Sequence, residues 1–148
     1  MSPGLLRRIA LLFGLILVGF WLSTEFVALP WAISGDSMEP GLSDGDRVLV
    51  DLWTYRQRPP RPGEVLLLRG PLPARQTLVK RAWKSPSDKD LRPRDGLWPN
   101  GPHRIGVWVL GDRGSASTDS RDFGSVPETE IRGRVLLRYW PPTRAGLK

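Results

Sequence analysis

The residues that could carry chemistry in this chain are few, because common nucleophiles and metal ligands are absent or scarce. The 148 residues include no cysteine and one histidine, His103, inside the turn-rich stretch NGPH. This composition excludes thiolate nucleophiles and cysteine-ligated metals, and it leaves a transition metal almost without nitrogen ligands. A Ser–His–Asp triad would depend on that single histidine. We therefore expect no metal and no other cofactor, and we look for a base other than histidine.

Lys80 is the strongest candidate for that base. The chain holds 22 Lys and Arg residues, of which only four are lysines. In the run Thr77–Trp83 (TLVKRAW), strand alternation puts Leu78, Lys80 and Ala82 on one face. If this face points inward, burial lowers the pKa of the lysine amine and provides a neutral general base. The alternative is an ordinary surface lysine on an edge strand.

Ser37 is the candidate nucleophile that such a base could activate. It lies in the stretch ISGDSMEP, where Gly35 permits a close turn and supplies an amide donor. Taken alone, a Gly-Asp-Ser stretch is a common turn. The serine is therefore a candidate nucleophile only in combination with the lysine that could activate it. The acids Asp36, Glu39 and Asp46 lie nearby, and the sequence leaves their role open.

Short β-strands are the elements that must position these residues. After Pro30, β-rich runs alternate with turn residues, and helical periodicity is nearly absent. The expected strands are 46–53, 64–69, 77–83, 105–110 and 131–140. The segments 56–62 and 85–103 are rich in proline, glycine and polar residues, which predicts loops. The sequence thus predicts a small, mainly antiparallel β domain over residues 30–148.

An apolar segment precedes this domain. Residues 9–29 contain one charged side chain, Glu25, and as a helix they would span about 30 Å, the thickness of a hydrocarbon core. The sequence therefore predicts a transmembrane anchor over residues 9–29. A cleaved signal peptide and a buried helix of a soluble fold are the alternatives, but the segment is long for a signal peptide and lacks a clear small-x-small site.

The arginines before the apolar segment predict the orientation of the chain. Arg7 and Arg8 would keep residues 1–8 in the cytoplasm and place the domain on the extracytoplasmic side of the cell membrane. The net charge of +7 would also suit an Arg-rich β module that binds nucleic acid or anionic lipid. However, the charge is dispersed and no nucleic-acid-binding signature occurs, so we expect no nucleic-acid partner.

Four segments, in order, resemble the successive motifs of type I signal peptidases. They are ISGDSMEP, GLSDGDRVLV, TLVKRA and GDRGSASTDSRDFGSV, and the similarity extends over residues 9–142. The resemblance implies a membrane-anchored serine endopeptidase with the β fold of the signal peptidase/LexA type. Such an enzyme removes signal peptides from exported preproteins through an acyl-enzyme, and prefers small residues at the first and third positions before the cut.

The resemblance also assigns roles to individual positions. Ser37 would be the nucleophile, with its own amide helping to hold the oxyanion, and Lys80 would take its proton and return it to the leaving amine. Ser117 matches a second serine that orients the lysine amine. Asp119 and Arg121 match an ion pair that braces the loop, a structural rather than a catalytic role.

The chain departs from the family pattern at several places. Gly35 stands where some members carry a serine whose hydroxyl helps to hold the oxyanion, so the hole would rest more on backbone donors. Only 30 residues separate Lys80 from Gly111, which leaves no room for the large accessory domain of many bacterial enzymes. In size the chain resembles mitochondrial inner-membrane peptidases and nickel superoxide dismutase maturation proteases.

Two other protease functions stay open at this point. One is a dedicated maturation protease for a single exported protein, and the other is a LexA-type self-cleaving protease. The expected partners are preprotein signal peptides and the lipid bilayer. The sequence indicates neither which preproteins are cut nor the oligomeric state.

Overall fold

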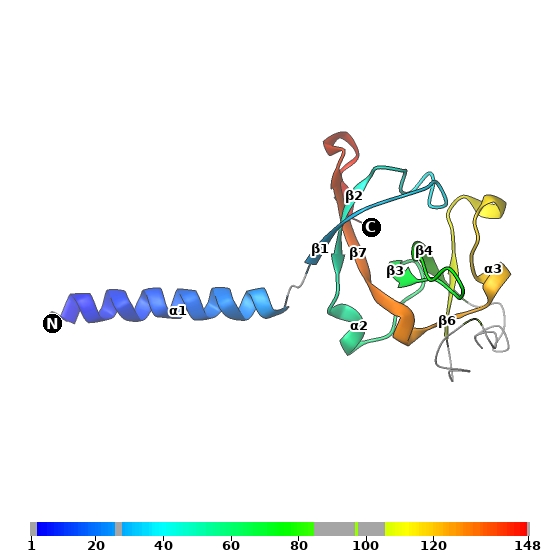
Figure 1. The fold of residues 1–148 in the computed structure, drawn as a ribbon. Coiled ribbons are helices and arrows are strands. Elements are labelled where there is room, and N and C mark those ends of the chain that lie inside the picture. The colour runs from blue at the N-terminus through cyan, green and yellow to red at the C-terminus, as the bar shows by residue number, and fades with distance from the viewer. Residues whose placement is uncertain (1–2, 26–27, 85–96, 98–105, 148) are drawn as a thin grey trace.

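The computed structural model describes residues 3–25, 28–84, 97 and 106–147. A long helix, α1 (Pro3–Glu25), extends away from a β domain and ends near the first strand (Figure 1). His103 and most of the expected loop 85–103 lie outside the described residues. Leu97, from the middle of that loop, packs against the core of the domain, and its carbonyl accepts a 2.9 Å hydrogen bond from the Leu72 amide.

The domain is built on an eight-stranded sheet in which every pairing is antiparallel. The strand order is β1-β2-β7-β3-β4-β5-β6, and β8 pairs with β7. The strands are β1 (Ala28–Ala32), β2 (Arg47–Asp51), β3 (Val65–Arg69), β4 (Thr77–Trp83), β5 (Gly106–Leu110), β6 (Val126–Pro127), β7 (Ile131–Trp140) and β8 (Gly146–Leu147). The mainly β, antiparallel architecture predicted from the sequence is confirmed.

Short helical turns connect the strands. They are α2 (Thr54–Gln57), α3 (Ser120–Phe123) and the 3₁₀ turns η1 (Gly114–Ala116), η2 (Glu128–Glu130) and η3 (Pro142–Arg144). Two apolar clusters form the core. One contains Ile33, Met38, Leu42, Val48, Val50, Val65, Leu67 and Val135, and the other contains Leu66, Leu68, Ala82, Val109, Phe123 and Val126. Strand β3 contributes alternate residues to both clusters, which explains why its sequence is apolar throughout.

Some expected boundaries were wrong, for local reasons. The expected strand 46–53 ends early, at Asp51. The Asp51 carboxylate accepts hydrogen bonds from the Trp53 amide at 2.7 Å and the Thr54 amide at 3.1 Å, and these bonds start α2. Helix α2 extends to Gln57 and takes the first two residues of the expected loop 56–62.

The sequence did not predict strand β1. It lies at the edge of the sheet, where Pro30 is tolerated because an edge strand does not need every backbone donor. The apolar segment 9–29 is consequently divided, with its last two residues, Ala28 and Leu29, in β1.

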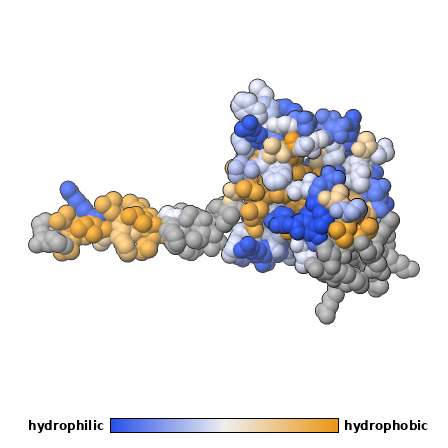
Figure 2. All heavy atoms as spheres, in the orientation of Figure 1, coloured by the Kyte–Doolittle hydropathy of each residue, from blue (hydrophilic) through white to orange (hydrophobic). Residues whose placement is uncertain are grey.

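Helix α1 displays apolar side chains to its surroundings. Figure 2 shows hydrophobic atoms along most of its described part, and Leu11, Leu15 and Ile16 are all more than 60% exposed. Nevertheless, in the part of the chain that the structure describes, no helix reaches the length and hydropathy needed to cross a membrane.

Candidate active site

Ser37 lies in the loop 33–46, which connects β1 to β2. Two backbone hydrogen bonds close the base of the loop, from the Ile33 amide to the Asp46 carbonyl at 2.8 Å and from the Gly45 amide to the Ile33 carbonyl at 3.0 Å. Met38 and Leu42 are buried in the core, whereas Ser37 is half-buried. The loop is therefore anchored by apolar side chains directly after the serine.

A buried ion pair fixes the same loop to β7. The Arg138 guanidinium donates to the Asp46 carboxylate at 2.8 Å and to the Gly41 carbonyl at 3.1 Å. Burial alone would raise the pKa of Asp46, but the Ser43 amide and the Arg138 and Arg144 guanidiniums lower it below its usual range. Asp46, whose role the sequence left open, thus remains ionised and ties the loop to the sheet.

Lys80 lies in the interior of the domain on β4, between β3 and β5. Its side chain is 2% exposed, and Leu78 and Ala82, which share its face, pack in the core. Of the two orientations that the sequence left open for this face, the structure has the inward one. Its Nζ donates a 2.9 Å hydrogen bond to the Ser117 hydroxyl. Burial lowers the pKa of the amine below the usual value, although the nearby Asp119 carboxylate acts in the opposite direction.

Gly111 brings the two candidate serines together. A Cβ added here would lie 2.5 Å from the Ser117 Cβ and 2.6 Å from the Ser37 carbonyl oxygen, so only a glycine fits between them. The Arg113 amide, two residues further on, donates to the Ser37 carbonyl at 3.2 Å. Ser37, Ser117 and Lys80 therefore belong to one cluster although they are far apart in the sequence.

The Asp119 carboxylate holds the loop that carries Ser117. It is fully buried, accepts the Gly111 amide at 2.9 Å, and binds the Arg121 guanidinium at 2.9 Å and 2.7 Å. Arg121 also donates to the Gly114 carbonyl. Burial would raise the pKa of Asp119, but these donors, Arg121 above all, lower it below its usual range. The carboxylate therefore organises the turn on both sides of Ser117.

The remaining residues near Ser37 have other contacts. Gly35 is exposed at φ +85°, a conformation that favours glycine, and its amide donates to the Asp44 carboxylate at 2.8 Å. Its amide is thus already engaged within the loop. Asp36 forms an exposed ion pair with Arg113, which links the Ser37 loop to the turn after β5.

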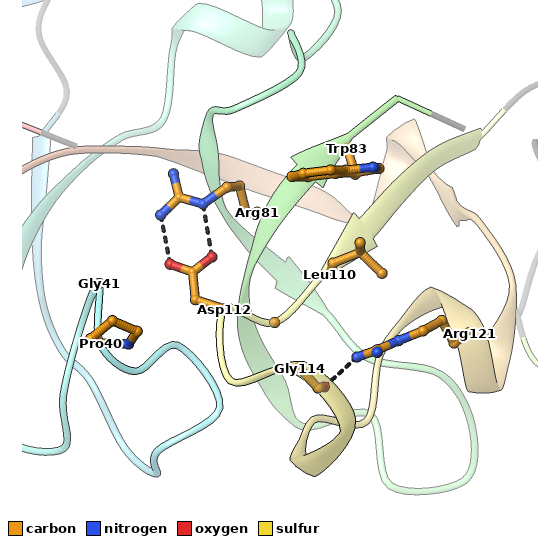
Figure 3. A pocket seen from close by; sticks show the side chains of 9 residues that line it. Pro40, Gly41, Arg81, Trp83, Leu110, Asp112, Gly114 and Arg121 are labelled. Carbon is orange, nitrogen blue, oxygen red and sulfur yellow. Dashed lines mark hydrogen bonds and ion pairs between the residues drawn. The ribbon is translucent and has the colours of Figure 1, made fainter. Parts of the chain in front are cut away.

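A further ion pair and a pocket lie next to this cluster, and sequence reasoning missed both. The Arg81 guanidinium binds the Asp112 carboxylate at 2.8 Å and 2.7 Å (Figure 3). Beside this ion pair lies a pocket of about 430 Å³, and Figure 3 shows most of the residues along it. Its walls include Pro40, Gly41, Trp83, Leu110, Gly111 and Arg121. Alternation places Arg81 on the face opposite Lys80, and no spacing rule connects it to Asp112.

Comparison with known proteins identifies the family. The sequence model of the family described as signal peptidase, peptidase S26, matches residues 6–103 and 84–140. The chain is 35% identical over 120 residues to the mitochondrial ATP-independent inner membrane protease subunit 1a of Arabidopsis thaliana, covering 77% of this chain and 71% of that protein. It is 29% identical over 155 residues to signal peptidase IB of Staphylococcus aureus (strain Mu50), covering 79% of this chain and 80% of that protein.

The chain therefore belongs to the signal peptidase family, peptidase S26, and is a hydrolase of the signal peptidase I type. This agrees with the family to which the ordered motifs pointed.

The burial of Lys80 predicts an unusual effect on stability. The Lys80→Met substitution removes a buried amine whose charged form burial disfavours, so we expect the free energy of unfolding to rise by about 1 kcal/mol at pH 7. Because the folded-state pKa is lowered, the unfolded chain binds more protons, and the wild type gains stability as the pH rises toward the ordinary lysine pKa. The advantage of the variant should therefore shrink in alkali.

Denaturant unfolding followed by tryptophan fluorescence would measure this difference. Lys84→Met, at an exposed lysine just after β4, is the matched control and should change the stability by less than about 0.5 kcal/mol. A Lys80→Met variant less stable than the wild type would instead indicate a structural lysine.

Proposed function

We propose that the chain is a membrane-anchored serine endopeptidase that removes signal peptides from exported preproteins, with Ser37 as nucleophile and Lys80 as general base. The observation that carries the proposal is that the Lys80 amine is buried and has a lowered pKa. This amine donates a hydrogen bond to Ser117, which lies against Gly111. A lysine can act as a base only when it is neutral, and burial favours the neutral form. The family and the names of its relatives support the substrate class.

In the proposed reaction, Lys80 accepts the proton of the Ser37 hydroxyl as its oxygen bonds to the carbonyl carbon of the substrate. The peptide C–N bond then breaks, and Lys80 returns the proton to the departing amine. A water molecule, deprotonated by the same amine, then attacks the acyl carbon. The ester bond to Ser37 breaks, the signal peptide leaves with a new carboxyl end, and Lys80 returns the proton to the Ser37 oxygen. The hydrogen bond from Lys80 to Ser117 orients the amine during both steps.

The sheet offers a place for an extended substrate next to this pair. All residues of β3 pair with β4, from Thr77 to Arg81. On its other edge, β4 pairs with β5 only from Arg81 to Trp83. In the described residues, the edge of β4 from Thr77 to Lys80 on the β5 side has no strand partner. An extended polypeptide could add to this edge through main-chain hydrogen bonds and so reach Lys80.

Substitution of the pair tests the mechanism. Cleavage of a model preprotein with an Ala-x-Ala site should fall by about 1,000-fold or more in Lys80→Arg, because a guanidinium cannot act as a base. In the wild type, kcat/KM should rise with pH as the Lys80 amine loses its proton, since burial lowers but does not abolish its basicity.

Exposed neighbours of the same residue type provide the controls. Ser37→Ala should abolish cleavage, while Ser115→Ala and Lys84→Arg, both at exposed positions, should leave it unchanged. Wild-type turnover by Lys80→Arg would refute the assignment of the base.

The proposal includes an anchor over residues 9–29, with residues 1–8 in the cytoplasm and residues 30–148 on the extracytoplasmic side. It is supported by the exposed apolar side chains of α1 and by Arg7 and Arg8 near its beginning. The relative from Arabidopsis thaliana is named an inner membrane protease.

Membrane extraction would test the anchor. The full chain should stay in the membrane fraction after alkaline carbonate treatment, and external protease should digest residues 30–148 in spheroplasts. Replacing Leu12 and Ile16, two exposed residues of α1, with arginine should release the protein into the soluble fraction, because each charge costs about 2.5–3.5 kcal/mol at the centre of a bilayer. Release of the wild-type chain by carbonate would refute the anchor.

A further inference from the structure

The pocket beside the Arg81–Asp112 ion pair is next to the candidate catalytic cluster but is not part of it. Gly111, which contacts both Ser37 and Ser117, also forms part of the pocket wall. From Lys80, strand β4 continues through Arg81 to Trp83, and both of these residues line the pocket. The pocket therefore lies beyond Lys80, on the side away from the open edge at Thr77.

Strand β5 occupies the edge of β4 from Arg81 to Trp83. An extended substrate that pairs with the open edge up to Lys80 would therefore leave the strand there and continue past Gly111, which lines this pocket. Trp83 is three residues from Lys80, which corresponds to about 10 Å of strand. An extended substrate chain that continues in the same direction covers that distance with about three residues. The side chain that enters the pocket would therefore belong to the second or third residue beyond the cleaved bond.

The volume of the pocket indicates which half of the substrate binds there. Under the proposed function, the residues before the cut carry small side chains. On that side of the serine, Val79 packs against the closed apolar cluster that contains Ile33 and Met38. A pocket of about 430 Å³ would not select for small side chains. It suits the segment after the cut, which begins the mature protein.

The walls of the pocket indicate the kind of side chain it takes. Trp83 is 54% exposed, and Figure 3 shows its indole ring next to Leu110 at the pocket. The charges of Arg81 and Asp112 compensate each other through two hydrogen bonds, and Arg121 is bound to the buried Asp119. Binding free energy would therefore come mainly from burying the exposed apolar surface against an apolar side chain of the substrate.

We propose that this pocket is a specificity site for the mature half of the substrate, in which Trp83 packs against a bulky apolar side chain at the second or third residue after the cut. The inference rests on the proposed function, which places small residues before the cut. The half of the substrate that reaches the pocket is assigned on that basis.

A series of preproteins that differ only at these two positions would test the inference with the full-length enzyme in detergent. With phenylalanine or leucine there, wild-type kcat/KM should exceed that of the glycine substrate by about five- to tenfold, as expected from partial burial of one apolar side chain. Trp83→Ala should remove this preference, so that the phenylalanine, leucine and glycine substrates have about equal kcat/KM. Trp83→Phe should restore much of it.

Trp140→Ala is the matched control, since Trp140 is 52% exposed, lies on β7 and does not line the pocket. It should keep the wild-type preference. Equal rates for all substrates in the wild type, or an equal loss for all of them in Trp83→Ala, would overturn the inference.

A binding measurement separates this inference from the proposed function. Fluorescence anisotropy of labelled preproteins on the Ser37→Ala variant, with and without Trp83→Ala, should show the same preference in affinity. If Ser37→Ala still cleaved the substrate, the proposed nucleophile would be wrong, while the preference itself could still be read from the affinities. If the affinities did not depend on Trp83, the pocket assignment would fail and the Ser37–Lys80 mechanism would stand.

Discussion

A lysine amine kept away from water beside a serine hydroxyl is the interaction on which the geometry of the site depends. A buried lysine is costly, and its pKa falls because the protein interior favours the neutral form. The sheet supplies this environment, since β4 lies between two strands and carries Lys80 on the face that also holds Leu78 and Ala82. The Ser117 hydroxyl then gives the amine a partner at 2.9 Å. The same features that disfavour an ammonium favour the neutral amine that the proposed base requires.

The parts around this amine are held by ionised groups away from the reacting atoms. Asp119 organises the turn that carries Ser117, and Asp46 with Arg138 fixes the loop that carries Ser37. Gly111 allows these two segments to approach each other closely. Buried carboxylates with lowered pKa values therefore serve here as scaffold. Among the described residues, Lys80 is a buried lysine whose pKa is lowered, as the proposed general base requires.

The sequence predicts those features that depend on local pattern. Strand alternation places Leu78, Lys80 and Ala82 on one face, and the runs of β-rich residues predict β4 and β7 at their observed bounds. The sequence leaves open whether that face points inward. It cannot predict contacts that depend on strand register. Arg81 reaches Asp112 because Arg81 pairs with Leu110 across β4 and β5, and Arg138 reaches Asp46 across 92 residues of chain. Similarly, the apolar run in β3 shows burial but not that two separate clusters share it.

Trapping the covalent intermediate and locating it by mass spectrometry would test the roles of Ser37 and Lys80 at the reacting atoms themselves. The full-length enzyme would be mixed with an Ala-x-Ala preprotein, quenched in acid within the first turnover and digested. We expect an acyl adduct on the peptide that contains Ser37, present in the wild type and absent in Lys80→Ala. An adduct on Ser117, or an undiminished Ser37 adduct in Lys80→Ala, would contradict the assignment of Ser37 as nucleophile and Lys80 as its base.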